Sequence, residues 1–408
     1  MSKVKSSNLG YPRIGVKREW KNSLEQLWAG KLEKESFLKQ IEEIRLNNLQ
    51  KQKDLGIDLI PVGDFSLYDH VLDTAVMFGL VPKRFEYDGG KVSLETYFDI
   101  ARGNKGAVAS EMTKWFNTNY HYIVPELNEA VPILVENRPL QFYKEAKQKL
   151  NIEGKPVILG PITFVKLSKG YKESDFKAVV EKFVPLYADI LRELQKEGVE
   201  WVQIDEPILS TTISKEDVAL FKDIYQTLHE AAPNIKLILQ TYFESIEHYE
   251  DVISLPVQGI GLDFVYDNGQ NLAALKKYGF PKDKVLAAGI IDGRNIWRAN
   301  LNNHSAILAE IADVVSKDRL IVQSSSSLLH VPVTVKSEET LDDVLKGALS
   351  FAIEKLHEIV LLTKGLNDGK ESIQKEISAS TEAIQALQKS SFRNNTQVQE
   401  AIQNLHTY

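Results

Sequence analysis

Short apolar runs along the chain alternate with segments whose apolar residues recur at helical spacing. The runs that read as strands lie at residues 7–10, 57–62, 157–160, 201–205, 236–243, 259–267, 285–293 and 320–330. Strands that alternate with helices pair in parallel, and eight such units predict a closed (β/α)8 TIM barrel. A doubly wound open α/β sheet is the alternative, but no strand is followed by the glycine-rich phosphate-binding pattern.

The stretch after the first strand has the properties of an anion site. Pro12 and Gly15 mark a sharp turn, and from about residue 16 apolar residues recur at helical spacing. This pattern puts Lys17, Arg18 and Lys21 in the first turns of a helix, where each cation is disfavoured by roughly 0.3–1 kcal/mol. Free backbone N–H groups together with these cations favour a bound anion. A solvated basic turn is the alternative.

Residues 66–155, between the second and third strands, are too long for an ordinary connection and must have structure of their own. Within this insertion, residues 116–122 alternate between aromatic or threonine side chains and Asn or His. The alternation predicts a strand with one wet face. Beside Lys114 that face is either a ligand-facing surface or a solvated edge.

The end of the chain has a different character. Residues 338–364 predict one long amphipathic helix that stops at Gly365. Residues 368–408 are rich in Gln, Ser, Glu, Asn and Ala and contain no candidate strand. We therefore expect a barrel domain over residues 1–367, and a helical connector over residues 368–408 that leads out of it.

Composition narrows the function classes. The 408 residues carry a net charge of −7, which argues against a general nucleic-acid binder and, with a local basic turn, favours a small anionic ligand. The chain has no cysteine, so a disulfide, a thiolate nucleophile and a cysteine-ligated zinc site are excluded within it. We find neither a long apolar span nor a signal-peptide pattern and expect a cytoplasmic protein without membrane partners.

Polar residues at the strand ends are the candidates for barrel chemistry. Asp205 and Glu206 suggest a glycosidase-like hydrolase, but successive strand residues point to opposite faces. This pair therefore needs a further carboxylate from another strand end, that of Asp64, Asp263 or Asp292. His330 has no nearby partner histidine and is more typical of a structural residue. The serines at 324–327 lack the G-x-S-x-G setting of a nucleophile.

Nine segments together resemble the N-terminal half of cobalamin-independent methionine synthase, in order from residue 7 to about residue 365. They are NLGYPRIGVKREWK, DLIPVGDFSLYDHVLD, EMTKWFNTNYHY, LGPITF, WVQIDEP, QTYFE, LPVQGIGLDFV, AGIIDGRNIWR and SSSSLLHVPV. The combination of long segments makes the resemblance specific.

The resemblance implies a function. Members of that family contain two fused barrels and transfer a methyl group from 5-methyltetrahydropteroyltri-L-glutamate to homocysteine, which gives methionine. Their catalytic zinc, and not cobalamin, is held by His, Cys, Glu and Cys of the C-terminal barrel. The N-terminal barrel contributes to binding the folate polyglutamate tail, and the matching residues here are Arg18, Glu19, Trp20, Lys21 and Lys114.

The match to the N-terminal barrel also implies that this chain holds no catalytic metal. The positions that correspond approximately to the zinc ligands of the other barrel are Gln240, Tyr242, Asp263 and the serines near Ser326. None of these is His or Cys. The sequence thus predicts a tail-binding half that is inactive without a C-terminal catalytic barrel; a free-standing hydrolase using Asp205 and Glu206 is the alternative.

Overall fold

The computed structural model describes residues 3–128 and 131–405 and contains one curled parallel sheet. Its eight strands are ordered β1-β10-β9-β8-β7-β6-β5-β2. A parallel bridge between Ser7 and Leu59 joins the two end strands, and the Leu59 amide donates to the Ser6 carbonyl at 3.0 Å. The predicted closed barrel is confirmed. The strands are β1 (Lys5–Ser6), β2 (Pro61–Val62), β5 (Lys155–Leu159), β6 (Trp201–Asp205), β7 (Lys236–Gln240), β8 (Gly259–Asp263), β9 (Val285–Ile291) and β10 (Leu320–Ser324).

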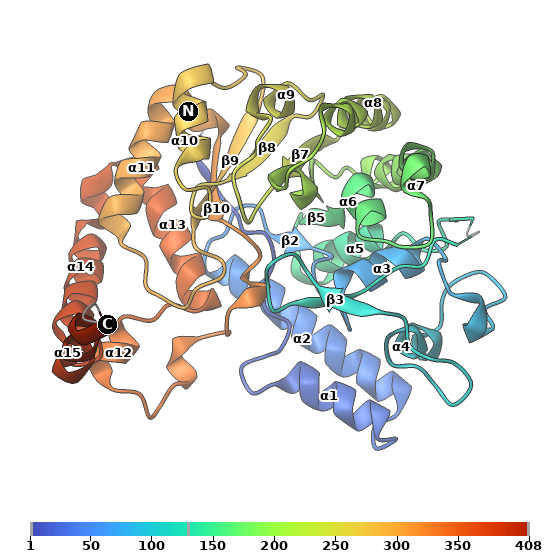
Figure 1. Ribbon diagram of the computed structural model, residues 1–408, viewed down its shortest axis with the longest axis horizontal. Coiled ribbons are helices and arrows are strands. Elements are labelled where there is room, and N and C mark those ends of the chain that lie inside the picture. Colours follow the sequence, from blue (N-terminus) through green and yellow to red (C-terminus); the bar gives the residue numbers. More distant parts are fainter. Residues whose placement is uncertain (1–2, 129–130, 406–408) are drawn as a thin grey trace.

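Helices surround this sheet on the outside (Figure 1). Those that follow barrel strands are α1 (Glu19–Trp28), α2 (Lys34–Asp54), α6 (Pro161–Lys166), α7 (Phe176–Lys196), α8 (Lys215–Ala231), α9 (Tyr249–Ile253), α10 (Gln270–Tyr278), α11 (Leu301–Val314), α12 (Asp343–Gly347) and α13 (Ala352–Asp368). The main core lies between the helices and the strands. There Phe78, Phe164 and Phe183 pack edge to face, and Tyr187 packs on Phe78 with its ring tilted. Within the described residues, no helix is long and apolar enough to span a bilayer.

The inside of the barrel changes from apolar to polar along the strands. Trp201, Ile238, Ala287 and Ile321 form a separate apolar cluster near the strand starts. Two residues further along, buried glutamines occupy three of the four strands, and the Gln323 amide donates to Gln240 at 2.9 Å. The polar end of the barrel is therefore its carboxyl-terminal mouth, the end at which barrel enzymes place their ligands.

The insertion between β2 and β5 covers one side of this mouth. It contains α3 (His70–Met77), α4 (Leu94–Arg102), α5 (Arg138–Leu150) and an antiparallel hairpin of β3 (Met112–Lys114) and β4 (His121–Ile123). The expectation of one strand over residues 116–122 is wrong in this respect. The chain turns between the two short strands, where Phe116 has a left-handed φ of 51°.

Several boundaries differ from the sequence prediction. The first strand lies at Lys5–Ser6 rather than at residues 7–10, because only the Ser7 bridge extends its pairing. The single helix expected over residues 338–364 is instead α12 and α13, separated by residues 348–351. Ala348 and Ser350 there pair with the chain before α11: Arg298 N donates to Ala348 O, and Ser350 N donates to Ile296 O.

Residues after α13 are helical, as expected, over the described part that ends at residue 405. They form α14 (Gln374–Lys389) and α15 (Thr396–Leu405). Ile377 and Leu387 of α14 are buried, and the helix packs on α11 and α12 (Figure 1). The buried Ser380 hydroxyl lies 3.4 Å from the amide of Leu301, which donates to it. The segment thus packs against the barrel at least as far as Arg393, whose guanidinium lies 4.9 Å from the ring centre of Trp297, and residues 406–408 lie outside the described part.

Candidate functional site

The turn between β1 and α1 carries the cations singled out in the sequence. Arg18 precedes α1 in a left-handed conformation with φ of 61°, so only Lys21 of the three cations lies inside the helix. The placement of Lys17 and Arg18 in the first helical turns is therefore wrong by one or two residues. Glu19 turns back, and its Oε2 accepts a hydrogen bond from the Lys17 amide at 2.9 Å.

The cations of this turn are exposed. The Lys21 ammonium lies 3.6 Å from Glu25, one turn further along α1, and both side chains are about half exposed. In the described part of the chain, Arg18 makes no side-chain hydrogen bond or ion pair. An exposed cation with no protein partner remains available to an anion in solution.

Trp20 connects this turn to the insertion through Arg13. The Arg13 guanidinium lies 4.4 Å from the ring centre of Trp20 and 5.5 Å from that of Tyr120, in the hairpin loop. Such cation–π contacts stabilise a partly desolvated cation. The indole Nε1 of Trp20 is buried and has no hydrogen-bond partner among the described residues.

Lys114 stands on β3 and pairs in register with His121 of β4. Its side chain is exposed, and no described residue forms a hydrogen bond or ion pair with it. The structure thus brings the predicted site residues together only in part. The Arg13 guanidinium contacts both Trp20 and Tyr120 of the hairpin loop and so links the turn to the hairpin. In the described chain, no hydrogen bond or ion pair joins Lys114 to Arg18 or Lys21.

The hairpin loop is tethered across the barrel mouth. The Arg294 guanidinium, just after β9, donates to Asn117 Oδ1 at 3.0 Å and to the Asn117 carbonyl at 2.9 Å. It also lies 5.1 Å from the ring centre of Phe243 and 5.0 Å from that of Tyr266. Asn117 is therefore a tether residue in this structure, not part of one uniform wet face.

Asp205 and Glu206 point to opposite sides of β6, as the alternation of strand residues predicts. Asp205 faces the barrel interior and accepts hydrogen bonds from Gln203 at 2.7 Å and from Tyr242 at 3.1 Å. Glu206 faces outward and accepts from the Thr163 amide, the Thr163 hydroxyl and Tyr225. Its carboxylate oxygens are thus already hydrogen-bonded to α6 and α8. Because the two carboxyls also point to opposite sides of the strand, they do not form a catalytic pair.

The positions matched to zinc ligands do not fit zinc. Gln240 accepts from Gln323, and Asp263 accepts from the amides of Phe243, Val265 and Tyr266. An amide, a phenol, a hydroxyl and one carboxylate form a poor donor set for this metal, which takes Cys, His and carboxylate ligands. No group of three or more His, Cys, Asp or Glu suited to a metal exists among the described residues.

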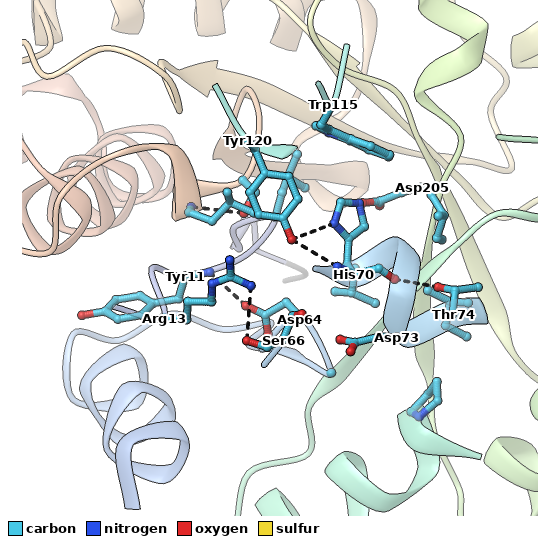
Figure 2. A pocket seen from close by; sticks show the side chains of 18 of the residues that line it. Tyr11, Arg13, Asp64, Ser66, His70, Asp73, Thr74, Trp115, Tyr120 and Asp205 are labelled. Atoms are coloured by element: carbon cyan, nitrogen blue, oxygen red, sulfur yellow. Dashed lines mark hydrogen bonds between the residues drawn. The ribbon is translucent and has the colours of Figure 1, made fainter. Parts of the chain in front are cut away.

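A pocket opens at the barrel mouth beneath the hairpin (Figure 2). Sequence reasoning had noted Asp64, Asp205 and His330 as strand-end residues, but it missed Arg13, His70 and Tyr120. Arg13 could have been noticed, since it is a cation within the same turn as Arg18. The complete lining is Leu9, Tyr11, Arg13, Gly63, Asp64, Ser66, His70, Asp73, Thr74, Met77, Trp115, Tyr120, Arg138, Pro139, Val157, Ile158, Leu159, Asp205, Tyr242, Phe243, Ser327, Leu329 and His330.

Burial shifts the titration of the pocket's ionisable groups. It raises the pKa of Asp64 to about 6 and that of Asp205 to about 7. It lowers the pKa of His70 to about 3, helped by Arg13, and that of His330 to about 4, helped by Arg294. Both histidines are therefore neutral at pH 7. The rings of Tyr120 and Phe243 contact His330 edge-on, consistent with the structural role expected for it.

Known proteins resemble this chain closely in sequence. Residues 5–316 match the family described as cobalamin-independent synthase, N-terminal domain. The 5-methyltetrahydropteroyltriglutamate–homocysteine methyltransferase of Listeria welshimeri is 60% identical over 405 residues, and that of Bacillus subtilis is 50% identical over 406. Each match covers 99% of this chain and 53% of the relative. The chain thus spans about half the length of the curated relatives it matches.

Solved structures show the same fold at low sequence identity. A B12-independent methionine synthase from Shewanella sp. W3-18-1 aligns with a TM-score of 0.61 at 15% identity, covering 93% of this chain and all of that one. A putative vitamin-B12-independent methionine synthase from Listeria monocytogenes aligns with a TM-score of 0.60 at 14% identity, covering 89% and 98%. At such identities the similarity establishes the barrel fold alone.

Proposed function

The chain belongs to the family of cobalamin-independent methionine synthases, and from this premise we propose that it is the half of such an enzyme that binds the folate polyglutamate tail. The whole enzyme would move a methyl group from 5-methyltetrahydropteroyltri-L-glutamate to homocysteine, as the names of the relatives state. Residues 1–367 would form the tail-binding barrel, and residues 368–408 the link to a C-terminal catalytic barrel. Homocysteine would reach only that second barrel.

The observation that carries the proposal is the exposure of the cations Arg18, Lys21 and Lys114, two of which have no anionic partner among the described residues. Arg18 and Lys114 have no anionic partner in the described chain, and Lys21 has only a loose, exposed one at 3.6 Å. A polyglutamate tail carries one carboxylate per residue along a flexible chain, so dispersed cations suit it better than a closed pocket. Trp20 and Glu19 would shape the turn, since Trp20 packs under Arg13 and Glu19 holds the Lys17 amide.

The chemistry of methyl transfer would lie elsewhere. Homocysteine must react as a thiolate, which zinc stabilises when it is bound. This chain has no cysteine, and its matched strand-end residues do not suit the metal. The role left to its residues is to bind and orient the tail of the folate.

The proposal is tested by titrating the 408-residue chain with mono- and triglutamate forms of 5-methyltetrahydrofolate. Each of Arg18→Ala, Lys21→Ala and Lys114→Ala should weaken triglutamate binding about two- to fivefold, because one exposed ion pair contributes roughly 0.2–1 kcal/mol. The triple variant should lose about thirtyfold, corresponding to roughly 2 kcal/mol. Monoglutamate binding should hardly change.

Lys222→Ala, in an exposed position on α8, is the matched control and should behave like the unmodified chain. The preference for triglutamate should also shrink as salt rises, since the Debye length is about 10 Å at 0.1 M and shorter above it. Equal weakening of both folates would assign these cations to the pterin ring or to the fold and would overturn the proposal.

A further inference from the structure

The mouth pocket lies between two neighbouring loops and the hairpin. One loop follows β1 and carries Arg13; the other follows β2 and carries Asp64 and Ser66 (Figure 2). The pocket contains about 950 Å³ of space free of protein atoms, its open entrance included. The cations proposed to bind the folate tail, Arg18, Lys21 and Lys114, do not line it.

Arg13 is a cation without an anion. Its guanidinium lies against the rings of Trp20 and Tyr120 and donates one hydrogen bond, to the Ser66 carbonyl at 3.3 Å. No carboxylate lies within ion-pair distance of it in the described part of the chain. Its remaining N–H groups thus have no protein acceptor, and a guanidinium fork is well suited to a carboxylate.

Asp64 is the complementary group. Its Oδ2 accepts from the Tyr11 amide at 2.9 Å. No described cation lies within ion-pair distance of the carboxyl, although the charge of the buried Lys155 acts on it from further away and lowers its pKa. The same two loops therefore make two cross-links, Tyr11 to Asp64 and Arg13 to Ser66. These links fix an unpaired guanidinium and an unpaired carboxyl beside one cavity without joining them to each other.

Ser66 supplies a second, independent sign of a ligand. Its side chain is 2% exposed, and its hydroxyl has no hydrogen-bond partner within residues 3–128 and 131–405. A buried hydroxyl without a partner destabilises the folded state, so such groups are usually satisfied by a bound molecule or water. Ser66 lines the same pocket as Arg13 and Asp64.

The remaining wall combines apolar surface with charged groups that already have partners: Asp73 pairs with Arg138 at 3.4 Å, and Asp205 accepts from Gln203 and Tyr242. Leu9, Met77, Leu159 and Leu329 contribute aliphatic surface, and Trp115 and Phe243 add aromatic rings. A molecule that fills this space should therefore have an anionic end, a cationic end and an apolar body. A simple anion would use Arg13 but leave Asp64 without a partner.

We propose that this pocket binds a small α-amino acid with an apolar side chain. Its carboxylate would lie against the Arg13 guanidinium and the Ser66 hydroxyl, and its ammonium group against Asp64. The pocket shares none of the three cations proposed to bind the tail, although Arg13 packs on Trp20 beside them, and the proposal does not depend on the tail site. It would give this barrel a ligand of its own at the end where barrel enzymes bind theirs.

The test is calorimetric titration of the 408-residue chain at pH 7.5 with three probes of equal length: L-norleucine, hexanoate and hexylamine. Norleucine should bind at least about tenfold more tightly than either of the others, because each lacks one charge-assisted contact. Equal affinity for norleucine and hexanoate, or no heat from norleucine at millimolar concentration, would overturn the proposal. Because this comparison uses only the unmodified chain, its result does not depend on whether any variant folds.

Variants locate the site. Arg13→Gln and Asp64→Asn should each weaken norleucine binding about tenfold or more, and Asp64→Asn should leave hexanoate binding unchanged. Arg102→Gln is the matched control, since Arg102 also stacks on a tryptophan, 4.0 Å from the ring of Trp28, but does not line the pocket. If Arg13→Gln fails to fold by circular dichroism, Arg13→Lys replaces it, with a smaller expected loss.

Arg18→Ala separates this site from the proposed tail site. It should weaken triglutamate binding and leave norleucine binding unchanged. Norleucine binding that survives both Arg13→Gln and Asp64→Asn would place the amino acid elsewhere and overturn the assignment.

Discussion

Glu206 is a buried carboxyl with a structural role. It accepts hydrogen bonds from the Ile162 and Thr163 amides at the start of α6 and from the Tyr225 hydroxyl of α8. Gly160 makes room for it, because a Cβ there would lie 1.8 Å from the Glu206 carboxyl. Burial nevertheless raises the pKa of Glu206 to about 8. The hydrogen bonds therefore offset only part of the cost of removing this charge from water.

The raised pKa predicts a pH-dependent effect of Glu206→Gln. Between about pH 4.5 and 8 the folded state keeps the proton that the unfolded chain has lost, so this group makes the folded state less stable as pH rises. The glutamine variant cannot titrate there. Relative to the unmodified chain, its free energy of unfolding should therefore improve by at least roughly 1 kcal/mol between pH 5 and pH 8.

Urea denaturation at the two pH values measures this difference, and Glu43→Gln, at an exposed position of α2, is the control. A stability difference that stays constant with pH would mean that Glu206 is already ionised in the folded state.

The orientation of a site residue could be predicted from the sequence only where neighbouring residues of the chain determine it. Asp205 and Glu206 were expected on opposite faces because side chains alternate along any strand, and this is confirmed. The contact of Arg13 with Tyr120 joins residues more than 100 positions apart, and no periodicity reveals it. The assignment of Arg18, Glu19, Trp20, Lys21 and Lys114 to the folate tail came from the family resemblance and stays a prediction.

At the scale of elements, the hairpin shows why alternation can mislead. Residues 116–122 alternate as a strand would, but the pairing of Lys114 with His121 forces a reversal between them. Phe116 takes a left-handed φ at that reversal, a conformation that propensity disfavours for a bulky residue. Its ring lies 5.9 Å from that of Phe243, so packing over the barrel mouth accompanies the turn.

Arg294 should control the mobility of this hairpin. Arg294→Ala removes two charged hydrogen bonds to Asn117 and the contacts with Phe243 and Tyr266. A loss of roughly 1–2 kcal/mol in local stability should speed amide hydrogen exchange of Trp115 and Thr118 about tenfold or more. Both amides bond within the loop, to Tyr120 and Trp115 respectively.

Hydrogen exchange followed by mass spectrometry over residues 112–123 measures the effect. Arg192→Ala removes an exposed arginine paired within its own helix, α7, and should leave this peptide unchanged. Unaltered exchange in Arg294→Ala would mean that ring packing alone holds the hairpin.

At the scale of the whole molecule, the sequence was sufficient for the architecture. Eight apolar runs separated by helical segments led to a barrel, and parallel pairing with closure through Ser7 and Leu59 confirms it. The packing of the last helices was harder to predict from the sequence. The polar composition of residues 368–408 suggested a connector that leads out of the barrel, but Ile377, Ser380 and Leu387 of α14 are buried.

The same architecture sets the limit of what this chain can do alone. A homocysteine thiolate at neutral pH needs a metal or a base to form, and a metal that lowers a thiol's pKa must itself be held by suitable ligands. The chain has no cysteine, and Gln240, Tyr242 and Asp263 at the strand ends are engaged with other side chains or with backbone amides. If the proposed function is right, the chain orients a folate tail but cannot activate the acceptor.

We therefore expect the purified 408-residue chain, supplied with zinc, homocysteine and 5-methyltetrahydropteroyltri-L-glutamate, to form no methionine above a control without protein. A full-length relative assayed in parallel, such as that of Listeria welshimeri, of which this chain covers 53%, verifies the reagents. Binding of the triglutamate without turnover would fit a tail-binding half. Methionine formed by the chain alone, and lost when Asp205 is replaced by Asn, would instead place a catalytic centre in this barrel and refute the division of labour between two halves.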